Sequence, residues 1–561
     1  MSVDIARAPR MPASSIVASA VYERSWKWVL GALVLTLILQ LPLVVLRAIN
    51  WDEFFHYSQV VKLANGTLSL PLQTLYTQAF VWVTALPGAG VDHVILIRLF
   101  MLGCELVTLA CIAGLAGRFT DRTTGLLCAL AYLSASFIFR HGTSFRFDPP
   151  AAALLMGSAW IFARAHMAPM RLALAAILAG ISTVLTIKTV LYAPVFAGIA
   201  WLVWTERGHR REDLFKLAAL AVGVVVCAGL VYLLHAASLA QGSAHEAESL
   251  VSNAGSSMFT LSDPFGYRRF IVWFAISSPL LAIPAFLAPF AIWWSERPTA
   301  RKIALTGFWL PLTTLFFYQN TAPYYYVFMM PPVAVAASPV LALLVRRYGA
   351  PLMAGAMLAC AAFVLATEPE STLARQRQIQ KEAMRLFPDG VAYFDSCAML
   401  GAFPKENIFM TPWGIAKYLN GHPETMVEAM ERGPVPLFVT NDAALEEAVT
   451  TQGKVAALLP QDLAAIRESY IHFWGPFWLA GRDVAAGAGP QDWHVHVPGT
   501  YTVRGGALRL DGRELARDDV VRLTRGVHRL ASDTPGVRLV WGDRLDVPAS
   551  PPPSKPYFMP F

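Results

Sequence analysis

Long apolar segments, separated by short basic clusters, constrain the fold of this chain more than any other feature. Residues 28–46 carry no charge, and as a helix of about 28 Å they would cross the hydrocarbon core of a bilayer. Only 15% of all residues are charged, against about 25% in soluble domains. We therefore expect a polytopic α-helical membrane protein. About eleven spans are predicted, near residues 28–46, 92–116, 123–139, 149–165, 171–187, 189–205, 215–236, 270–294, 303–318, 325–345 and 350–367.

The basic clusters predict which side of the membrane each connection faces, because short loops rich in arginine and lysine stay in the cytoplasm. Basic residues precede the first span, and we expect that span to be retained rather than cleaved as a signal peptide. With eleven spans, "GRFTDR", "ARAHMAPMR", "TERGHRR", "SERPTARK" and "VRRYG" all fall on the cytoplasmic side. The net charge of +7 therefore reflects topology and not nucleic-acid binding. The predicted location is the cytoplasmic (inner) membrane of a bacterium.

The chain divides into four predicted regions. Residues 1–26 form a cytoplasmic N-terminus, and residues 27–367 form a membrane domain with long outer loops at 49–91 and 237–269. Beyond it, "VAYFDS" and "VPLFVT" resemble short buried strands among helical patterns, which predicts a periplasmic α/β region at 368–469. Short alternating strands with glycine turns, such as "WHVHVPGTYTV", predict a periplasmic β-sandwich-like region at 470–561.

Lys188 lies where the chain must turn inside an apolar stretch. Residues 171–205 would form a helix of about 50 Å, too long for one crossing, and both ends of the stretch are basic. The chain is therefore expected to cross outward and return, turning near "TIKTV" at the outer surface. A lysine at that depth is costly unless it meets an anion or a water-filled cavity.

Acids, cations and tyrosines recur at the outer ends of the predicted spans. "INWDEFFHY" places Asp52 and Glu53 directly after the first span, where the alternative is two solvated acids at a membrane exit. A single residue of this kind is usually an interface anchor. The whole set on one face is typical of a cavity that binds an anion and activates a hydroxyl. The other members are His141, Arg146, Asp148, Lys188, Tyr267, Arg268, Arg269, Tyr324, Tyr325 and Tyr326.

The order and sidedness of these motifs resemble the C-type (GT-C fold) glycosyltransferases. An acidic pair follows the first span, Asp148 follows the third, Lys188 lies between the fifth and sixth, and "PYYYVFMMPPVAVAASP" forms an aromatic, proline-rich late span. Over residues 25–370 the chain is similar to the bacterial aminoarabinose transferases and the protein O-mannosyltransferases. The resemblance implies a polyprenyl-phosphate sugar as donor, used outside the cytoplasmic membrane. It also implies that Asp52 is the catalytic carboxylate and Asp148 the second acidic residue of the family's pattern.

One stretch departs from that pattern. The aminoarabinose enzymes carry Glu-Lys-Pro-Pro in the first loop, whereas this chain has "LYTQAF", with Gln78 where a charge is expected. The scattered histidines His56, His93, His141 and His245 also lack a recognisable ligand spacing. Both observations argue against a fixed metal. No cofactor is therefore predicted, and a divalent cation stays an alternative.

The expected chemistry assigns roles to the residues. The lipid phosphate leaves as an anion that lysine and arginine stabilise, and a carboxylate accepts the proton of the acceptor hydroxyl. An inverting displacement needs one base, which we assign to Asp52, while Glu53 orients it, holds a cation or pairs with an arginine. The catalytic candidates are Asp52, Glu53 and Asp148. The candidate substrate-binding residues are His56, Gln78, His141, Arg146, Lys188, Tyr267, Arg268, Arg269, Tyr324 and Tyr325.

The predicted function is therefore transfer of a sugar to an extracytoplasmic glycan, lipid (such as lipopolysaccharide) or protein. A transporter or flippase for a lipid-linked sugar is the first alternative, although transporters usually place charges near the bilayer midplane. A membrane-anchored binding protein is the second. Inside the second span, Arg98 and Glu105 are seven residues apart and are expected to pair with each other, directly or through a bridge.

Overall fold

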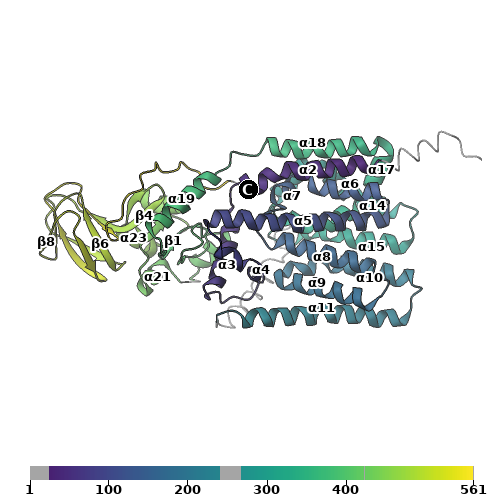
Figure 1. Cartoon of the computed structure of the whole chain (residues 1–561), viewed down its shortest axis with the longest axis horizontal. Coiled ribbons are helices and arrows are strands. Elements are labelled where there is room, and N and C mark those ends of the chain that lie inside the picture. The colour runs from purple at the N-terminus through teal and green to yellow at the C-terminus, as the bar shows by residue number, and fades with distance from the viewer. Residues whose placement is uncertain (1–24, 241–266, 422–423, 560–561) are drawn as a thin grey trace, which may run out of the picture.

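The computed structural model describes residues 25–240, 267–421 and 424–559. The molecule is elongated, with a helical bundle at one end and a mixed α/β region at the other (Figure 1). The predicted fold class, a helical membrane domain followed by a sheet-containing region, is confirmed in this outline. The bundle helices are α2 (Trp26–Leu46), α5 (Gly90–Phe119), α6 (Arg122–Leu133), α7 (Ser136–His141), α8 (Asp148–Ala163), α9 (Pro169–Leu185), α10 (Ala193–Glu206), α11 (Arg211–Ala237), α13 (Arg268–Ser277), α14 (Pro279–Trp293), α15 (Thr299–Trp309), α16 (Tyr325–Ala336), α17 (Ser338–Tyr348) and α18 (Ala350–Ala366).

Helices occupy each segment that the apolar pattern predicted as a span. Among the described residues, four helices are long and apolar enough to cross a bilayer, or up to six if two bent pairs each count as one span. The pairs bend by 108° between α13 and α14 and by 63° between α16 and α17. Pro279 and Pro339 lie in the first turn after each bend, where a missing amide hydrogen costs nothing. The total of eleven crossings stays a prediction.

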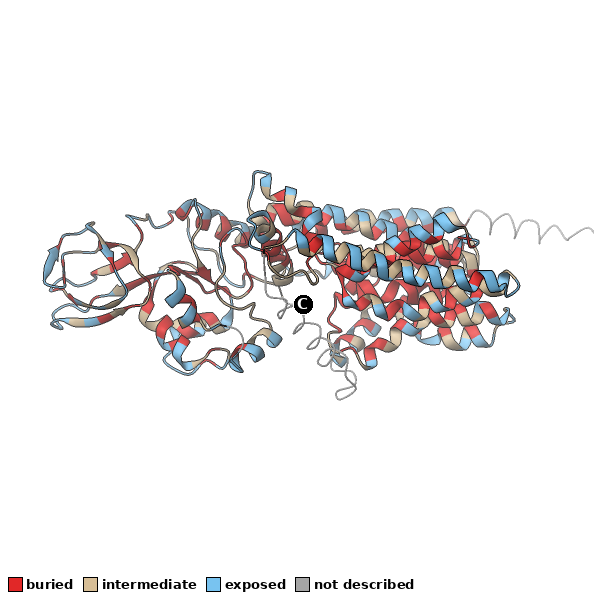
Figure 2. Cartoon of the chain, turned by 90° about the horizontal axis from the view of Figure 1, so that it is seen from below, coloured by how far each residue is buried: buried red, intermediate tan, exposed pale blue. Residues whose placement is uncertain are grey.

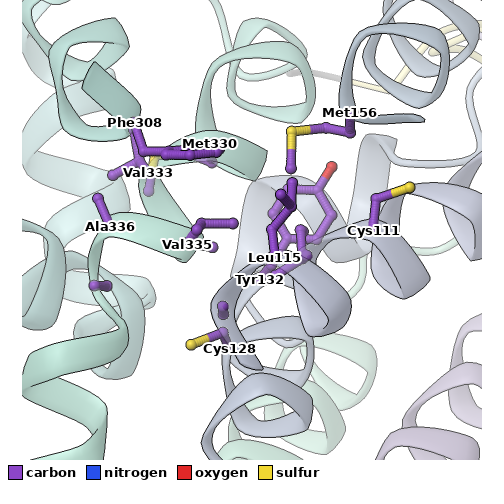
Figure 3. Close-up of a cluster of buried hydrophobic side chains, with 14 of the residues drawn as sticks. Cys111, Leu115, Cys128, Tyr132, Met156, Phe308, Met330, Val333, Val335 and Ala336 are labelled. Atoms are coloured by element: carbon purple, nitrogen blue, oxygen red, sulfur yellow. The ribbon is translucent and has the colours of Figure 1, made fainter. Parts of the chain in front are cut away.

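The bundle has a buried interior and an outer surface that is largely apolar. Buried residues line the interior, and exposed ones face outward along the helices (Figure 2). Many of the outward residues are large and apolar, including Val222, Leu230 and Phe286, as expected for side chains in contact with lipid. The interior packs Tyr132 and Met330 together with smaller side chains (Figure 3), and the Tyr132 hydroxyl donates to the Val327 carbonyl at 3.0 Å.

The first outer loop folds into short helices against the bundle. These are α3 (Trp51–Ala64), α4 (Tyr76–Phe80) and the 3-10 helix η1 (Val81–Ala85). A reciprocal cap starts α3: the Asn50 side chain accepts from the Glu53 amide at 3.0 Å, and the Glu53 carboxylate accepts from the Asn50 amide at 3.1 Å. The cap fixes the chain direction at the point where the acidic pair begins.

The region after the bundle contains two sheets. The strands are β1 (Tyr393–Phe394), β2 (Leu437–Val439), β3 (Tyr470–Trp474), β4 (Phe477–Asp483), β5 (Gln491–Val495), β6 (Gly499–Arg504), β7 (Leu508–Leu510), β8 (Arg513–Leu515), β9 (Val520–Leu523), β10 (Gly526–Ala531) and β11 (Arg538–Trp541). The helices are α19 (Leu373–Leu386), α20 (Pro412–Leu419), α21 (Met426–Arg432), α22 (Ala443–Thr450) and α23 (Pro460–Ser469). One sheet has the order β1-β2-β4-β11-β6-β9, with β3 paired to β4, and the other has the order β5-β10-β7-β8. Strand β2 pairs with β4, so sequences before and after residue 470 share a sheet.

Helix α19 binds both ends of the first outer loop. The Gln376 side chain accepts from the Ile49 amide at 2.9 Å and donates to the Ile49 carbonyl at 2.7 Å. One turn later, the Gln380 side chain accepts from the Val91 amide at 2.9 Å. Gln376 also donates to the Tyr557 carbonyl at 2.9 Å, in a segment whose next residue, Phe558, packs edge-on against Phe54 of α3. The region after the bundle therefore holds the loop that carries Asp52.

Candidate active site

Asp52 faces a buried arginine from a distant part of the chain. It lies in the first turn of α3, and its carboxylate forms an ion pair with the guanidinium of Arg146, in the connection between α7 and α8. The Arg146 Nε also donates to Asp148 at 3.2 Å, so one guanidinium bridges two carboxylates. The second Asp148 oxygen pairs with the ammonium of Lys188, which lies on the 3-10 helix η2 (Ile187–Tyr192).

These four residues, Asp52, Arg146, Asp148 and Lys188, form what we call the charged quartet. Asp148, Arg146 and Lys188 are buried, and 15% of the Asp52 side chain is exposed. The two cations match the two carboxylates in number, so the quartet as a whole is neutral. Asp52 and Asp148 supply the oxygens that a divalent cation would use, and both are already engaged by cationic side chains.

Aromatic rings surround the two cations. The Arg146 guanidinium lies 3.5 Å from the centroid of the Tyr324 ring. The Lys188 ammonium lies 4.8 Å from the ring centroid of Phe147 and 5.8 Å from that of Tyr325. Cations are attracted to aromatic faces, which helps to hold both side chains in place without adding negative charge.

Electrostatics keep Arg146 charged and His56 neutral. Burial alone would lower the pKa of Arg146, but Asp52 and Asp148 raise it above its usual value. Burial lowers the pKa of His56 well below its usual value, and the charges of Arg146 and Lys188 lower it further. His56 is therefore a neutral imidazole at neutral pH. Its Nδ1 lies 2.8 Å from the Tyr76 hydroxyl.

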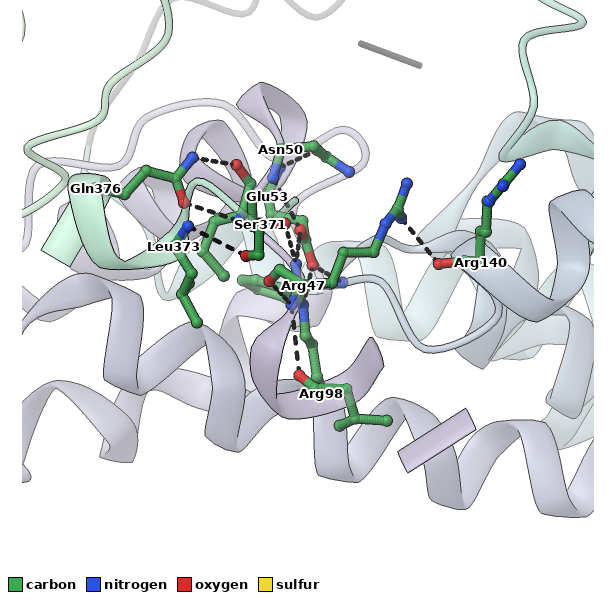
Figure 4. Close-up of polar contacts among 12 residues, drawn as sticks. Arg47, Asn50, Glu53, Arg98, Arg140, Ser371, Leu373 and Gln376 are labelled. Atoms are coloured by element: carbon green, nitrogen blue, oxygen red, sulfur yellow. Dashed lines mark hydrogen bonds and ion pairs between the residues drawn. The ribbon is translucent and has the colours of Figure 1, made fainter. Parts of the chain in front are cut away.

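Glu53 takes the ion-pair role, one of the three considered for it. Its carboxylate is fully buried and accepts from the Arg98 Nε at 2.8 Å and from the Arg98 Nη2 at 2.5 Å (Figure 4). It also accepts from the Phe145 amide at 2.7 Å. Burial would raise the pKa of Glu53, but Arg98 and the amide donors lower it overall. Glu53 follows Asp52 in the chain and Phe145 precedes Arg146, so this hydrogen bond holds together the two segments that carry the Asp52–Arg146 ion pair.

The expected pairing of Arg98 with Glu105 is wrong. Arg98 pairs with Glu53, whereas Glu105 accepts from the Gln40 side chain at 3.3 Å. Seven helical residues rise about 10 Å, which places the two side chains on one face but too far apart to touch. Each finds a nearer partner on another element. The Arg98 guanidinium also donates to the Arg47 carbonyl at 2.7 Å and the Ala48 carbonyl at 2.9 Å, at the end of α2.

The other predicted site residues are distributed more widely. His141 is buried in α7. Gln78 donates to the Ser238 hydroxyl at 2.7 Å, which joins α4 to the end of α11. Tyr267 stacks on Phe270, and Arg268 and Arg269 are exposed on α13. No contact between these three and the charged quartet is present among the described residues, and most of the predicted loop 237–269 lies outside them.

A large apolar cavity begins beside the quartet. It has a volume of about 1170 Å³ and runs between α9, α10 and α11. His56, Tyr76 and Phe147 line one part of it, and apolar residues such as Phe196 and Val225 line another. Phe147 also contacts Lys188, so the cavity and the quartet share a wall. The sequence offered no signal for this cavity, because residues that line an apolar groove have the same composition as residues that face lipid.

Known proteins with a similar sequence or structure define the fold. The sequence model of the family described as "Dolichyl-phosphate-mannose-protein mannosyltransferase" matches residues 76–232. ArnT from Cupriavidus metallidurans, solved with undecaprenyl phosphate bound, is similar with a TM-score of 0.54 and 13% identity over 77% of this chain and 97% of that chain. No curated protein sequence matches the chain.

A second solved structure covers more of the chain. The oligosaccharyltransferase of Archaeoglobus fulgidus, in complex with Zn and sulfate, is similar with a TM-score of 0.51 and 10% identity, over 90% of this chain and 96% of that chain. In its apo form the TM-score is 0.52, with 9% identity over 90% of this chain and 94% of that chain. The chain therefore has the fold of the C-type glycosyltransferases. This confirms the resemblance that the sequence motifs indicated.

Proposed function

We propose that the protein transfers a sugar from a polyprenyl-phosphate donor to an acceptor outside the cytoplasmic membrane, by inverting displacement. The observation that carries this proposal is the charged quartet at the wall of the apolar cavity. A lipid-linked sugar needs such a site, because its long apolar chain and its phosphate must be bound side by side. The solved ArnT structure, which holds undecaprenyl phosphate, supports a donor of this class.

The donor would bind with its lipid in the cavity and its phosphate at the cationic side chains. Lys188 and Arg146 are the buried cations nearest the cavity wall formed by Phe147. When the sugar leaves, negative charge remains on the lipid phosphate, and fixed cations stabilise it without reorganising. Neutral His56 lines the cavity and offers a hydrogen bond to the phosphate or the sugar.

Asp52 is the proposed general base. Its carboxylate is the most exposed group of the quartet, so an acceptor hydroxyl can approach it more readily than Asp148. The carboxylate accepts the hydroxyl proton as the oxygen attacks the anomeric carbon, and the bond to the phosphate oxygen breaks on the opposite face. Asp148 then holds Arg146 and Lys188 in position. The acceptor is a cell-envelope glycan, lipid or protein.

An experiment separates this function from that of a flippase. Purified protein would be mixed with a radiolabelled polyprenyl-phosphate sugar and a cell-envelope extract, and then separately reconstituted in liposomes with the same donor. A transferase releases polyprenyl phosphate and moves the label to an acceptor. Movement of the intact donor across the liposome bilayer, with no release of polyprenyl phosphate in either mixture, would favour the flippase.

Lys188→Ala should weaken donor binding and slow sugar transfer. The substitution removes one of two buried cations available to the phosphate, and it leaves Asp148 paired with Arg146. Donor affinity and turnover are measured on the purified variant, with Lys302→Ala as a control, since Lys302 is half-buried on α15 and donates to the Trp293 carbonyl at 3.1 Å. Wild-type affinity and turnover in Lys188→Ala would show that the lysine has a structural role only.

The proposed topology places residues 368–561 outside the cytoplasm. Alkaline phosphatase fused after Ala366 should therefore be active, because this enzyme folds in the periplasm, and a fusion after Arg347 should be inactive. The basis is the cytoplasmic position of all inter-span basic clusters in the eleven-span count. The reverse pattern of activity would invert the assignment of sides.

A further inference from the structure

Two histidines and a glutamate converge in the region farthest from the bundle. His494 lies on β5, His496 follows it two residues later, and Glu468 lies near the end of α23. Because side chains at i and i+2 of an extended chain point to the same face, both imidazoles face the helix. The ligand atoms of the three residues all lie within 4.8 Å of one another. Helix α23, which carries Glu468, lies away from the bundle helix α8 that begins at Asp148 (Figure 1), and the proposed transfer reaction does not use this cluster.

Two distances between ligand atoms in the cluster are close to those between neighbouring ligands of one metal ion. The His494 Nδ1 lies 3.1 Å from the His496 Nε2, and the His496 Nε2 lies 3.4 Å from a Glu468 carboxylate oxygen. In a tetrahedral site with metal–ligand bonds of about 2.1 Å, adjacent ligand atoms are about 3.4 Å apart. The ligands come from two elements, so their convergence depends on the tertiary fold and not on local sequence.

Backbone contacts hold the cluster in this arrangement. The second Glu468 oxygen accepts from the His494 amide at 3.3 Å, and the Glu468 carbonyl accepts from the Trp493 indole at 3.3 Å. The Arg525 Nε donates to the His496 carbonyl at 3.3 Å. The carboxylate is thus oriented by the strand that carries the histidines, just as hydrogen bonds to the ligands orient them in metal sites.

We propose that Glu468, His494 and His496 bind a divalent transition-metal ion of the Zn²⁺ class. Two imidazole nitrogens and one carboxylate favour zinc or a similar ion over magnesium or calcium, which prefer oxygen ligands. The partly exposed side chains of Glu468 and His496 leave room for water as the remaining ligand. The bound ion joins α23, next to the larger sheet, to β5 of the smaller sheet, and so stabilises the packing of these two elements.

The test uses the full-length protein in detergent, with any affinity tag removed and metals stripped by a chelator. Titration with ZnCl₂ should show one Zn²⁺ bound per chain at this site and a higher melting temperature. The double variant His494→Gln/His496→Gln should lose both effects. The matched control is His472→Gln/His528→Gln, because these histidines lie in the same region and bond to Gly475 and Asp511 instead.

Three results would overturn the proposal. They are no Zn²⁺ binding by the wild type, unchanged binding by His494→Gln/His496→Gln, and equal loss of binding in the control. The metal-free melting temperatures of the variants are compared with the wild type, so that unfolding is not mistaken for a lost ligand. Glu468→Gln, which keeps the shape of the side chain, should weaken binding if the carboxylate is a ligand and supplies a second, milder variant.

Discussion

Asp52→Asn should slow sugar transfer by about 10²- to 10⁴-fold, the usual cost of removing a general base. The amide keeps the shape of the side chain but cannot accept the proton of the acceptor hydroxyl. Donor binding should change far less, because Lys188 and the cavity remain, and Arg146 keeps its contact with Asp148. The measurement is single-turnover transfer from a polyprenyl-phosphate sugar, with donor affinity determined in parallel.

The matched control is Asp92→Asn, since Asp92 also lies in the first turn of a helix, α5, but pairs with exposed Arg377. It should transfer sugar at close to the wild-type rate. If Asp52→Asn is fully active, the base lies elsewhere, and Asp148 is the next candidate. If Asp52→Asn is active and Glu53→Gln is not, the roles of the two acids are exchanged.

Arg98→Met should destabilise the protein by about 3–5 kcal/mol, the typical cost of leaving one partner of a buried ion pair uncompensated. The Glu53 carboxylate would remain buried with amide donors alone. The measurement is thermal or denaturant unfolding in detergent. Arg118→Gln is the control, because Arg118 pairs with Glu206 at a more exposed position and should cost about 0–1 kcal/mol.

The pH dependence of this variant follows from the same pair. In the wild type the pKa of Glu53 is lowered in the folded state, so the pair's contribution is present above the ordinary carboxyl range and is lost as the pH falls. In Arg98→Met, burial would dominate and raise the pKa of Glu53. Protonation of Glu53 at low pH would then remove the cost of burying an unpaired carboxylate. The stability difference between variant and wild type should shrink toward acidic pH. The destabilisation caused by Arg98→Met should also be smaller when Glu53 is replaced by Gln. An equal destabilisation with Glu53 and with Gln at this position would show that the two residues are not coupled.

The sequence predicted the membrane helices and part of the site for clear physical reasons. Apolar segments are unambiguous when they are long. Because a buried charge needs a partner, Lys188 was expected to meet an anion or a water-filled cavity, and in the structure it pairs with Asp148. The partner of Arg98 was missed because helical spacing predicts only contacts within one helix. The actual partner, Glu53, lies on another helix, and its position depends on the tertiary fold. The glutamines of α19 had a weak signal, since Gln376 and Gln380 share the face that carries buried Leu373 and Ala383.

The hydrogen bonds from α19 to Ile49 and Val91 have a consequence for how the chain can be divided. A fragment that stops at residue 368 keeps the bundle but loses the side chains that fix both ends of the first outer loop, so the loop would gain freedom and Asp52 would lose its position. For the same reason, exchanging the region after residue 368 with that of a protein of the same fold would fail unless the two glutamines came with it. The geometry of the proposed active site therefore depends on the whole chain, and substitutions on one side of residue 368 are constrained by residues on the other.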